Sequence, residues 1–247
     1  MKTALAVILT PIFYCLAYVL VIIFGTIYII TFPIPARHMQ WYIKLCCRII
    51  LLACGQWVRV RGKPPDQDGG PYLYIINHGS AFDAFMIGAM IPKYFAIVAA
   101  EYNFKLPFWG SIVRRFGAIP VDRVKLKEAI ASMNEAEKIL IDPKDDNRRS
   151  LVVFPEGTRT LTGRLQPFKK GAFHIVINTG VVVVTCGICG AYENYNRRSW
   201  LIRPGVITWI WGKPEYELSC NYHYCSVEEL AEYFHHEIRI LIGEVKI

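Results

Sequence analysis

Charged side chains are absent from the first part of the chain: none lies between Ala4 and Ile30. This apolar stretch is longer than the core of a signal peptide, roughly 7–15 residues, and no cleavage site of small residues follows it, so we expect it to be retained. A helix over Pro11–Phe32, with Thr10 as its N-cap, would extend about 33 Å and could cross a hydrocarbon core. Pro33 would end that helix.

Cysteine is too scarce to hold the fold together, because eight cysteines in 247 residues do not make a disulfide framework. Cys186 and Cys189 form a CxxC pair in a valine-rich run, but a zinc site would need two more ligands at suitable spacing, and none stands out. We interpret the cysteines as reduced core residues, which favours a catalytic domain on the cytoplasmic face of a membrane. No metal is expected.

Acidic residues are outnumbered, with 20 Asp and Glu against 28 Lys and Arg, while 53% of the chain is hydrophobic and its mean hydropathy is +0.29. A protein both basic and apolar suits an anionic membrane surface as its partner. Nucleic acid is not expected as a partner, because the basic residues are dispersed and no nucleic-acid-binding module is visible. Internal repeats and low-complexity segments are also missing.

A second apolar segment, Arg37–Gly55, differs from the first in carrying a polar stripe with a spacing of three or four residues: Arg37, Gln40, Lys44 and Arg48. The other faces carry Trp41, Tyr42, Leu45, Ile49 and Leu52. An apolar helix with a cationic stripe suits the headgroup boundary of a membrane, although a core helix with a solvated edge would show the same pattern. We therefore expect residues 1–56 to form a membrane-anchoring helical hairpin.

Residues 57–247 alternate short β-branched runs with helical stretches, which predicts an α/β domain with a central, roughly seven-stranded mixed sheet covered by helices. The expected strands are Trp57–Arg61, Tyr72–Ile76, Ala96–Val98, Ala118–Val121, Leu151–Phe154, Val181–Thr185 and Val206–Trp211. The expected helices are Ser80–Ile91, Pro107–Phe116, Lys125–Ile141, Phe168–Thr179 and Ser226–Ile242.

The end of one expected strand carries the first group of candidate catalytic residues. His78 follows the run Tyr72–Ile76, and Asp83 lies five residues later in the first turn of the next expected helix. A carboxylate on one ring nitrogen would fix the tautomer, so that the other nitrogen could remove a proton from an alcohol. Ser80 and Asp83 also match a capping box, a pattern that needs no catalysis.

Two further strand ends carry charged residues. The valine-rich strand before Phe154 runs into Pro155-Glu-Gly-Thr-Arg-Thr160, a loop with a permissive glycine, a hydroxyl and a guanidinium that could hold a phosphate. A buried Glu156 there would pair with a cation or order the loop. Gly117–Arg123 repeats the pattern, with Asp122 and Arg123 at its end. Three such ends predict a basic cleft for acid–base work on an anionic substrate.

These blocks resemble those of the glycerolipid acyltransferases, most closely the bacterial 1-acylglycerol-3-phosphate acyltransferases of the PlsC type. Asn77, His78 and Asp83 match the family's NHx4D block, Gly117–Arg123 its second block and Phe154–Thr160 its FPEGTRT block. The resemblance extends over roughly 72–188, and an apolar two-helix segment also precedes the domain in some family members.

The resemblance implies that His78 is a general base oriented by Asp83. It further implies that the glycerol phosphate of the acceptor is bound by Arg123, Glu156, Gly157, Thr158 and Arg159. The implied reaction moves a fatty acyl group from acyl-CoA or acyl carrier protein to the free hydroxyl of lysophosphatidate, giving phosphatidic acid. Loop N–H groups near Gly157 are expected to stabilise the oxyanion. No cofactor other than the thioester co-substrate, and no covalent enzyme intermediate, is expected.

The sequence departs from the family pattern in three places. Pro120 replaces a bulky apolar residue, the valine-rich run Val181–Thr185 lacks the usual proline, and Ala99-Ala100 stands where a lysine is common. The acceptor could therefore be another lysolipid or glycerol 3-phosphate. Two other classes remain open: a serine hydrolase using Ser80, although no G-x-S-x-G occurs, and a non-catalytic lipid-binding membrane protein.

Overall fold

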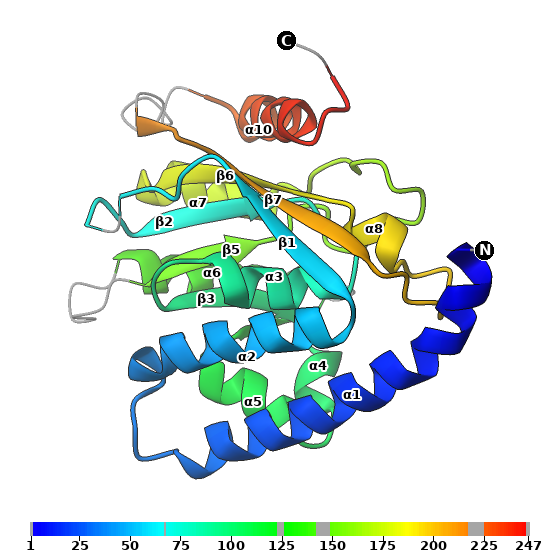
Figure 1. The fold of residues 1–247 in the computed structure, drawn as a ribbon. Coiled ribbons are helices and arrows are strands. Elements are labelled where there is room, and N and C mark those ends of the chain that lie inside the picture. Colours follow the sequence, from blue (N-terminus) through cyan, green and yellow to red (C-terminus); the bar gives the residue numbers. More distant parts are fainter. Residues whose placement is uncertain (1, 67, 123–125, 142–148, 217–224, 246–247) are drawn as a thin grey trace.

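A computed structural model gives the fold, and it describes the whole chain except residues 1, 67, 123–125, 142–148, 217–224 and 246–247 (Figure 1). One seven-stranded sheet lies at the centre, in the order β1-β7-β6-β2-β5-β3-β4. Neighbouring strands are parallel except β6 and β7, so β1 and β7 run against the other five. The predicted mixed α/β sheet is confirmed.

The strands are β1 (Gln56–Arg61), β2 (Tyr72–Ile76), β3 (Phe95–Ala100), β4 (Ile119–Val121), β5 (Ser150–Val153), β6 (Val182–Cys189) and β7 (Gly205–Pro214). The helices of the sheet domain are α3 (Phe82–Met90), α4 (Tyr102–Lys105), α5 (Trp109–Phe116), α6 (Leu126–Ile141), α7 (Gly171–Thr179), α8 (Ala191–Asn194) and α10 (Val227–Leu241). The short helices α4 and α8 were not predicted, because a single turn leaves no periodicity to detect.

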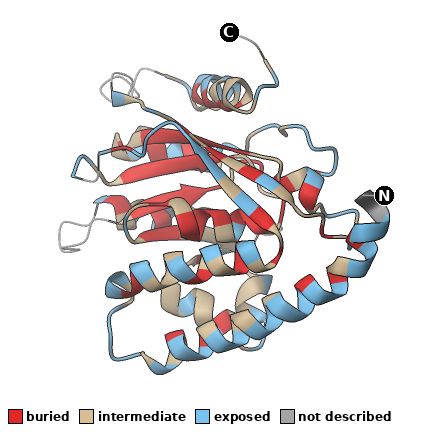
Figure 2. Ribbon diagram, in the orientation of Figure 1, coloured by how far each residue is buried: buried red, intermediate tan, exposed pale blue. Residues whose placement is uncertain are grey.

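The central strands β2 and β5 are buried on both faces (Figure 2), which explains why they read as continuous apolar runs. Alternate residues of β2 enter two separate cores: Tyr74 and Ile76 pack with α2 and α3, whereas Leu73 and Ile75 pack with α6, α7 and α10. β4 is an edge strand and accommodates Pro120, since an edge position does not need every backbone N–H. The domain is thus three layers, helix on sheet on helix.

The N-terminal helix α1 (Lys2–Ile30) begins earlier than the sequence predicts. Thr10 was expected as its cap, but Pro11 lies inside the helix and the Thr10 hydroxyl donates back to the Ala6 carbonyl at 2.6 Å. The same hydroxyl accepts from the Ile202 N–H at 2.9 Å, so tertiary contact decides its role. By length and composition α1 is the one helix of the described chain that could cross a membrane, and an 18-residue window within Ala4–Ile30 has a mean hydropathy of 2.6.

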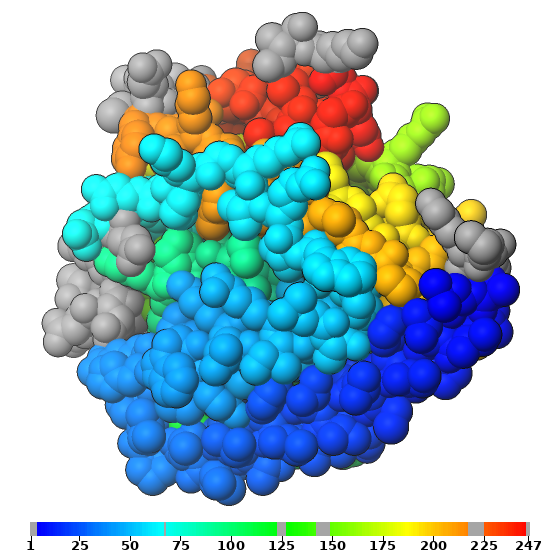
Figure 3. All heavy atoms as spheres, in the orientation of Figure 1, coloured from blue at the N-terminus to red at the C-terminus, as the bar shows by residue number. Residues whose placement is uncertain are grey.

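α1 does not stand free of the domain. Near its start Tyr14 donates to the Trp200 carbonyl at 3.0 Å. Near its end Gly25 lies against α5 so closely that an added Cβ would meet Ile112 at 2.5 Å. Beyond the helix, the Arg115 guanidinium donates to the Thr31 carbonyl at 2.6 Å. α1 therefore lies along the protein surface, as the space-filling view also shows (Figure 3).

The second helix, α2 (Gln40–Ala53), follows the single turn η1 (Ala36–Met39), and part of its polar stripe contacts the domain. The chain after Gly88 in α3 presents carbonyls to all three stripe residues of this helix: Gln40 donates to Ile91, Lys44 to Pro92 and Arg48 to Ala89, at 3.4, 2.6 and 3.5 Å. Gln40 is buried and Lys44 is bound to the domain, so these two residues do not face lipid headgroups; they satisfy carbonyls at the C-terminal end of α3, where positive charge is favourable. Arg37 and Arg48 of the stripe are exposed, and for them the headgroup contact stays a prediction.

The face of α2 that points away from the domain is mostly apolar. Its exposed apolar residues are Trp41, Leu45 and Leu52, which we call the outer face of α2, and the exposed Arg48 lies beside them at the same helical spacing. Leu51, next in the chain, is fully buried in the core shared with β2. Residues 1–56 therefore contribute to the same hydrophobic core as the sheet, and β1 begins at their end.

The CxxC cysteines lie on β6 and face opposite sides of the sheet. Cys186 is buried in the core with α2 and α3, whereas the Cys189 thiol lies against the Ile242 carbonyl at the end of α10. Residues three apart on a strand project to opposite faces, so the two sulfurs cannot share a ligand.

Candidate active site

His78 and Asp83 come together as their spacing predicts. β2 ends at Ile76, the chain turns through Gly79 and Ser80, and α3 begins at Phe82. Asp83 Oδ2 lies 2.8 Å from His78 Nδ1. The Asp83 side chain is fully buried, whereas 17% of the His78 side chain is exposed, so a substrate can reach the imidazole.

Asp83 also binds the turn that precedes its own helix. The same Oδ2 accepts from the Gly79 and Ser80 amides, each at 2.8 Å, and an oxygen with three N–H donors suits a charged carboxylate. Of the two roles that the sequence offered for Asp83, the contact with His78 is present, whereas α3 has no side-chain cap. A carboxylate beside Nδ1 favours the tautomer with its proton on that nitrogen, which leaves the lone pair on Nε2.

Two neighbours fix the histidine from other directions. The imidazole stacks on Phe154, with ring centroids 3.9 Å apart and an angle of 15° between the planes. Asn77 extends the pairing of β2 with β6, because its side chain donates to the Ile188 carbonyl and accepts from the Ile188 amide, at 2.9 and 2.7 Å. The asparagine of the first block therefore acts on the backbone, and Phe154 is a positioning residue that motif reasoning missed.

Glu156 braces the two motif loops together. Its Oε1 accepts from the His78 amide at 2.6 Å, and its Oε2 accepts from the backbone and side-chain N–H groups of Gln166 at 3.0 and 3.3 Å. The Thr160 amide completes the brace by donating to the His78 carbonyl at 2.9 Å. Burial raises the pKa of Glu156 to about 7. Of the two roles expected for a buried Glu156, the contacts match the ordering of a loop.

Gly157, Thr158 and Arg159 form the half-buried turn of the second motif, and we call these three residues the anion turn. Gly157 has a φ of 72°, which suits glycine, and the Lys169 side chain covers it, with Cε 2.9 Å from where a Cβ would stand. The Gly157 amide donates to the Phe154 carbonyl at 3.0 Å, so of the loop N–H groups expected near Gly157 this one is already bonded. The amides of Thr158 and Arg159 have no acceptor among the described residues.

Thr158 is held at both ends by residues distant in the sequence. Its carbonyl accepts from Gln166 Nε2 at 3.1 Å, and its hydroxyl accepts from Arg197 Nη1 at 3.0 Å. Arg197 lies in the loop between α8 and β7, and sequence reasoning missed it because no motif surrounds it. Arg123 lies outside the described residues, and its strand β4 ends two strands away from β5.

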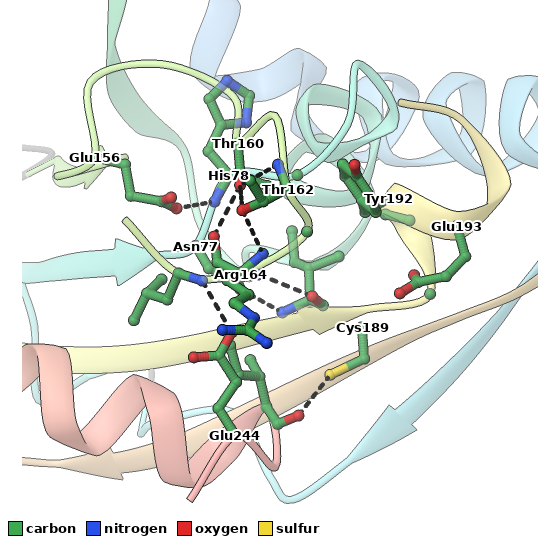
Figure 4. Close-up of a pocket in the computed structure, with 17 residues that line it drawn as sticks. Asn77, His78, Glu156, Thr160, Thr162, Arg164, Cys189, Tyr192, Glu193 and Glu244 are labelled. Carbon is green, nitrogen blue, oxygen red and sulfur yellow. Dashed lines mark hydrogen bonds between the residues drawn. The ribbon is translucent and has the colours of Figure 1, made fainter. Parts of the chain in front are cut away.

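A cavity of about 360 Å³ lies behind the His78 backbone. In Figure 4 the imidazole points away from Arg164, Cys189 and Glu244, which line the opposite part of this cavity. Ser80 is fully buried and its hydroxyl donates to the Tyr195 carbonyl at 2.6 Å. A buried hydroxyl engaged in this way is not placed to act as a nucleophile with His78.

A family model described as "Acyltransferase" matches residues 57–189, more than half of the chain. The chain belongs to the acyltransferase family. The match begins with β1 and ends with β6, so it contains both motif loops and the His78–Asp83 pair. As in the resemblance drawn from the motifs, the characteristic residues of this acyltransferase lie at the carboxyl ends of the parallel strands.

Several characterised relatives are named 1-acyl-sn-glycerol-3-phosphate acyltransferase. The protein of Cocos nucifera is 30% identical over 76% of this chain and 60% of its own length, and that of Saccharomyces cerevisiae is 32% identical over 69% and 58%. The Escherichia coli protein is 30% identical over 67% of this chain and 66% of its own. The acyltransferase thus aligns with about three fifths of the coconut and yeast relatives.

A solved structure shares the fold over almost the whole chain. The crystal structure of the 1-acyl-sn-glycerophosphate (LPA) acyltransferase PlsC from Thermotoga maritima superimposes with a TM-score of 0.81, covering 99% of this chain and 97% of that one at 23% identity. The shared fold includes the N-terminal helices, because the coverage leaves out almost no residues.

Proposed function

We propose that this acyltransferase moves a fatty acyl group from a thioester donor, acyl-CoA or acyl carrier protein, to the free hydroxyl of lysophosphatidate. The observation that carries the proposal is the 2.8 Å contact of His78 Nδ1 with a buried carboxylate, which leaves Nε2 as a base on the accessible side. The names of the relatives support the same acceptor.

The reaction transfers one proton from the acceptor hydroxyl to His78 and then from His78 to the leaving thiolate. His78 Nε2 takes the proton of the acceptor hydroxyl as the oxygen attacks the thioester carbonyl. The tetrahedral intermediate collapses with formation of the ester and cleavage of the carbon–sulfur bond. The imidazolium, stabilised by Asp83, returns the proton to the leaving thiolate. We assign the oxyanion to the amides of Thr158 and Arg159, which have no other acceptor among the described residues.

The phosphate of the acceptor is assigned to the anion turn, with Arg159 as a donor of paired N–H groups. Arg159 is half-buried and has no carboxylate partner among the described residues, so its charge is available. Arg123 stays an expectation from the motif. Glu156, also expected among the phosphate-binding residues, already accepts hydrogen bonds on both oxygens, and we assign it to bracing the loops.

The outer surfaces of α1 and α2 supply the membrane contact in this proposal. Both carry exposed apolar side chains, among them Ile8, Tyr18 and Ile30 on α1 and the outer face of α2. Because α1 is attached to the domain near both of its ends, we propose that it lies in the membrane beside the catalytic domain, on the cytoplasmic face. A lysolipid and its product could then stay in the bilayer during the reaction.

The test is an assay of the purified full-length protein in lipid micelles, with lysolipids paired against acyl-CoA and acyl carrier protein. Wild type should acylate lysophosphatidate, and His78→Ala should reduce kcat by roughly a hundredfold or more. Asp83→Asn should also be strongly impaired, since an amide can hold the wrong tautomer of the imidazole.

Folding of each variant is checked by circular dichroism. A folded His78→Ala protein that keeps more than a tenth of the wild-type rate would remove the base assignment. A wild type inactive on every lysolipid, yet able to bind one, would favour the non-catalytic lipid-binding protein. Labelling of Ser80 by a fluorophosphonate would revive the hydrolase, which its burial disfavours.

A further inference from the structure

The loop between α8 and β7 places a guanidinium on the anion turn. Arg197 is exposed, and its Nη1 donates to the Thr158 hydroxyl at 3.0 Å. Only one of its N–H groups is used by this bond, and the Thr158 hydroxyl keeps a proton to donate. Two donors from different parts of the chain therefore stand side by side and remain able to bind a further acceptor.

The loop that carries Arg197 is fixed to the catalytic residues. The Tyr195 carbonyl accepts from Ser80, two residues after His78. The loop closes on itself, because Asn196 donates to the Tyr192 carbonyl at 3.2 Å and the Arg203 amide donates to the Asn194 carbonyl at 2.8 Å. The position of Arg197 relative to the imidazole is thus set by hydrogen bonds at both ends of the loop.

Positive charge collects on the anion turn without a counter-charge. Lys169 covers Gly157, Arg197 binds Thr158, and Arg159 is the third residue of the turn. None of these three cations has a carboxylate within ion-pair distance among the described residues. The nearest acid in sequence, Glu156, is turned inward onto the His78 and Gln166 amides. Adjacent cations repel one another, and a dianionic ligand would relieve that repulsion.

We propose that Arg197 binds the phosphate monoester of the acceptor together with Arg159, and that it sets the preference for this headgroup over a phosphodiester. This inference rests on the proposed function. A planar guanidinium offers paired donors to two phosphate oxygens, and a monoester presents more free, charged oxygens than a choline diester does.

The phosphates of a coenzyme A donor could also bind a cation here, but the surroundings of the loop favour the acceptor. Trp200 and Ile202, on the same loop, are bonded to Tyr14 and Thr10 of α1, the apolar helix proposed to lie in the membrane. Arg197 is therefore carried by a loop bonded to that helix, and we expect the headgroup of a lysolipid to arrive there from the bilayer.

The experiment compares Arg197→Ala and Arg197→Lys with Arg198→Ala as the matched control. Arg198 is the next residue, is also exposed, and makes a hydrogen bond only through its backbone amide among the described contacts. We expect Arg197→Ala to lower kcat/KM for lysophosphatidate about tenfold or more and to leave that for lysophosphatidylcholine nearly unchanged. Arg197→Lys should recover part of the loss, and Arg198→Ala should match wild type. Arg159→Ala serves as the comparison for a residue of the motif itself.

Three results would overturn the inference while leaving the proposed function standing. In the first, Arg197→Ala lowers kcat equally for lysophosphatidate and lysophosphatidylcholine, and Thr158→Val causes the same loss. Arg197 would then stabilise the conformation of the anion turn and would not bind the phosphate. In the second, the variant raises KM for acyl-CoA and not for lysophosphatidate, which would assign the charge to the donor. In the third, wild type and Arg197→Ala show the same ratio of kcat/KM for lysophosphatidate and lysophosphatidylcholine.

Binding of lysophosphatidate in the absence of donor, measured by thermophoresis, keeps the two proposals separable. If wild type binds lysophosphatidate at least tenfold more tightly than Arg197→Ala does but turns over no substrate, the catalytic proposal fails and the phosphate assignment holds. If the two proteins bind it equally, the phosphate assignment fails whatever the turnover.

Discussion

His78 is controlled by contacts on every part of the residue. Asp83 holds Nδ1, Phe154 holds the ring plane, and Glu156 and Thr160 hold the backbone N–H and carbonyl. A histidine held in this way rarely rotates out of position, because several independent contacts would have to break together. Burial of Glu156 is a cost of this arrangement, since a carboxylate removed from water resists ionisation.

The titration of Glu156 predicts a dependence of stability on pH. Its pKa rises from 4.5 in the unfolded chain to about 7 in the folded protein, so the folded state binds the extra proton. The stability that this proton contributes is complete below about pH 4.5 and is lost as the pH rises to about 7. Between pH 5 and pH 8 the free energy of unfolding of wild type should therefore fall relative to that of Glu156→Gln, by at most about 3 kcal/mol. The Tm of wild type should fall relative to that of the variant in the same direction.

The comparison with Glu156→Gln cancels all other titrating groups, because both proteins share them. Melting curves at closely spaced pH values measure the difference. A constant difference in Tm over this range would mean that Glu156 is already ionised at pH 5 in the folded protein.

At the scale of elements, α2 separates two kinds of contact on its two faces. Its polar stripe satisfies the carbonyls at the end of α3, and burial together with the neighbouring Arg48 lowers the pKa of Lys44. Its outer face is largely exposed, with 64% of Trp41 and 59% of Leu52 accessible. Gln40 and Lys44 of the stripe therefore contribute to folding, and we propose that the outer face contacts the membrane.

Paired substitutions on α2 test this division. Replacing Trp41, Leu45 and Leu52 by serine should weaken flotation with neutral phosphatidylcholine vesicles and leave the Tm nearly unchanged. Leu51→Ala, at the buried neighbour of Leu52, should cost about 2–5 kcal/mol of stability and leave vesicle binding intact in the folded fraction.

Lys44→Ala should lower the Tm by roughly 2–4 °C for each 1 kcal/mol lost, without a change in vesicle binding. The division is wrong if the serine variant floats like wild type, or if Lys44→Ala weakens binding to anionic vesicles at an unchanged Tm.

At the scale of the whole molecule, the N-terminal helices are part of the fold that holds the site. Phe13, Ile50 and Leu51 share a core with Tyr74 of β2 and Trp209 of β7. α1 also supports the loop that carries Arg197, through Tyr14 and Thr10. A hairpin that served only as an anchor would make neither contact.

Deletion of residues 1–55 should consequently damage the domain as well as its attachment. The truncated chain would expose one face of the sheet to water, and apolar surface uncovered on that scale favours aggregation. We expect soluble yield to fall sharply and the remaining protein to elute as large species in size-exclusion chromatography. A monomeric 56–247 protein that melts cooperatively and loses only its membrane binding would show that the helices are separable.

The residues of the chain determined a good part of this picture before any coordinates. The apolar runs of β2 and β5 specify buried strands because both faces of the sheet are covered, and the turn at Gly79 and Ser80 brings Asp83 back onto His78 over five residues. Local contacts of this kind depend on spacing alone. The same holds for the positive φ of Gly157 in a short loop.

Only the tertiary structure decided the rest, because it depends on which surfaces meet. Periodicity places Lys44 and Arg48 on one face of α2 but cannot say whether lipid headgroups or the carbonyls of α3 lie opposite. Thr10 has the pattern of a cap, yet its partner is Ile202. Arg197 is 39 residues from Thr158 in sequence, and a hydrogen bond over that separation exists only once the strands have assembled.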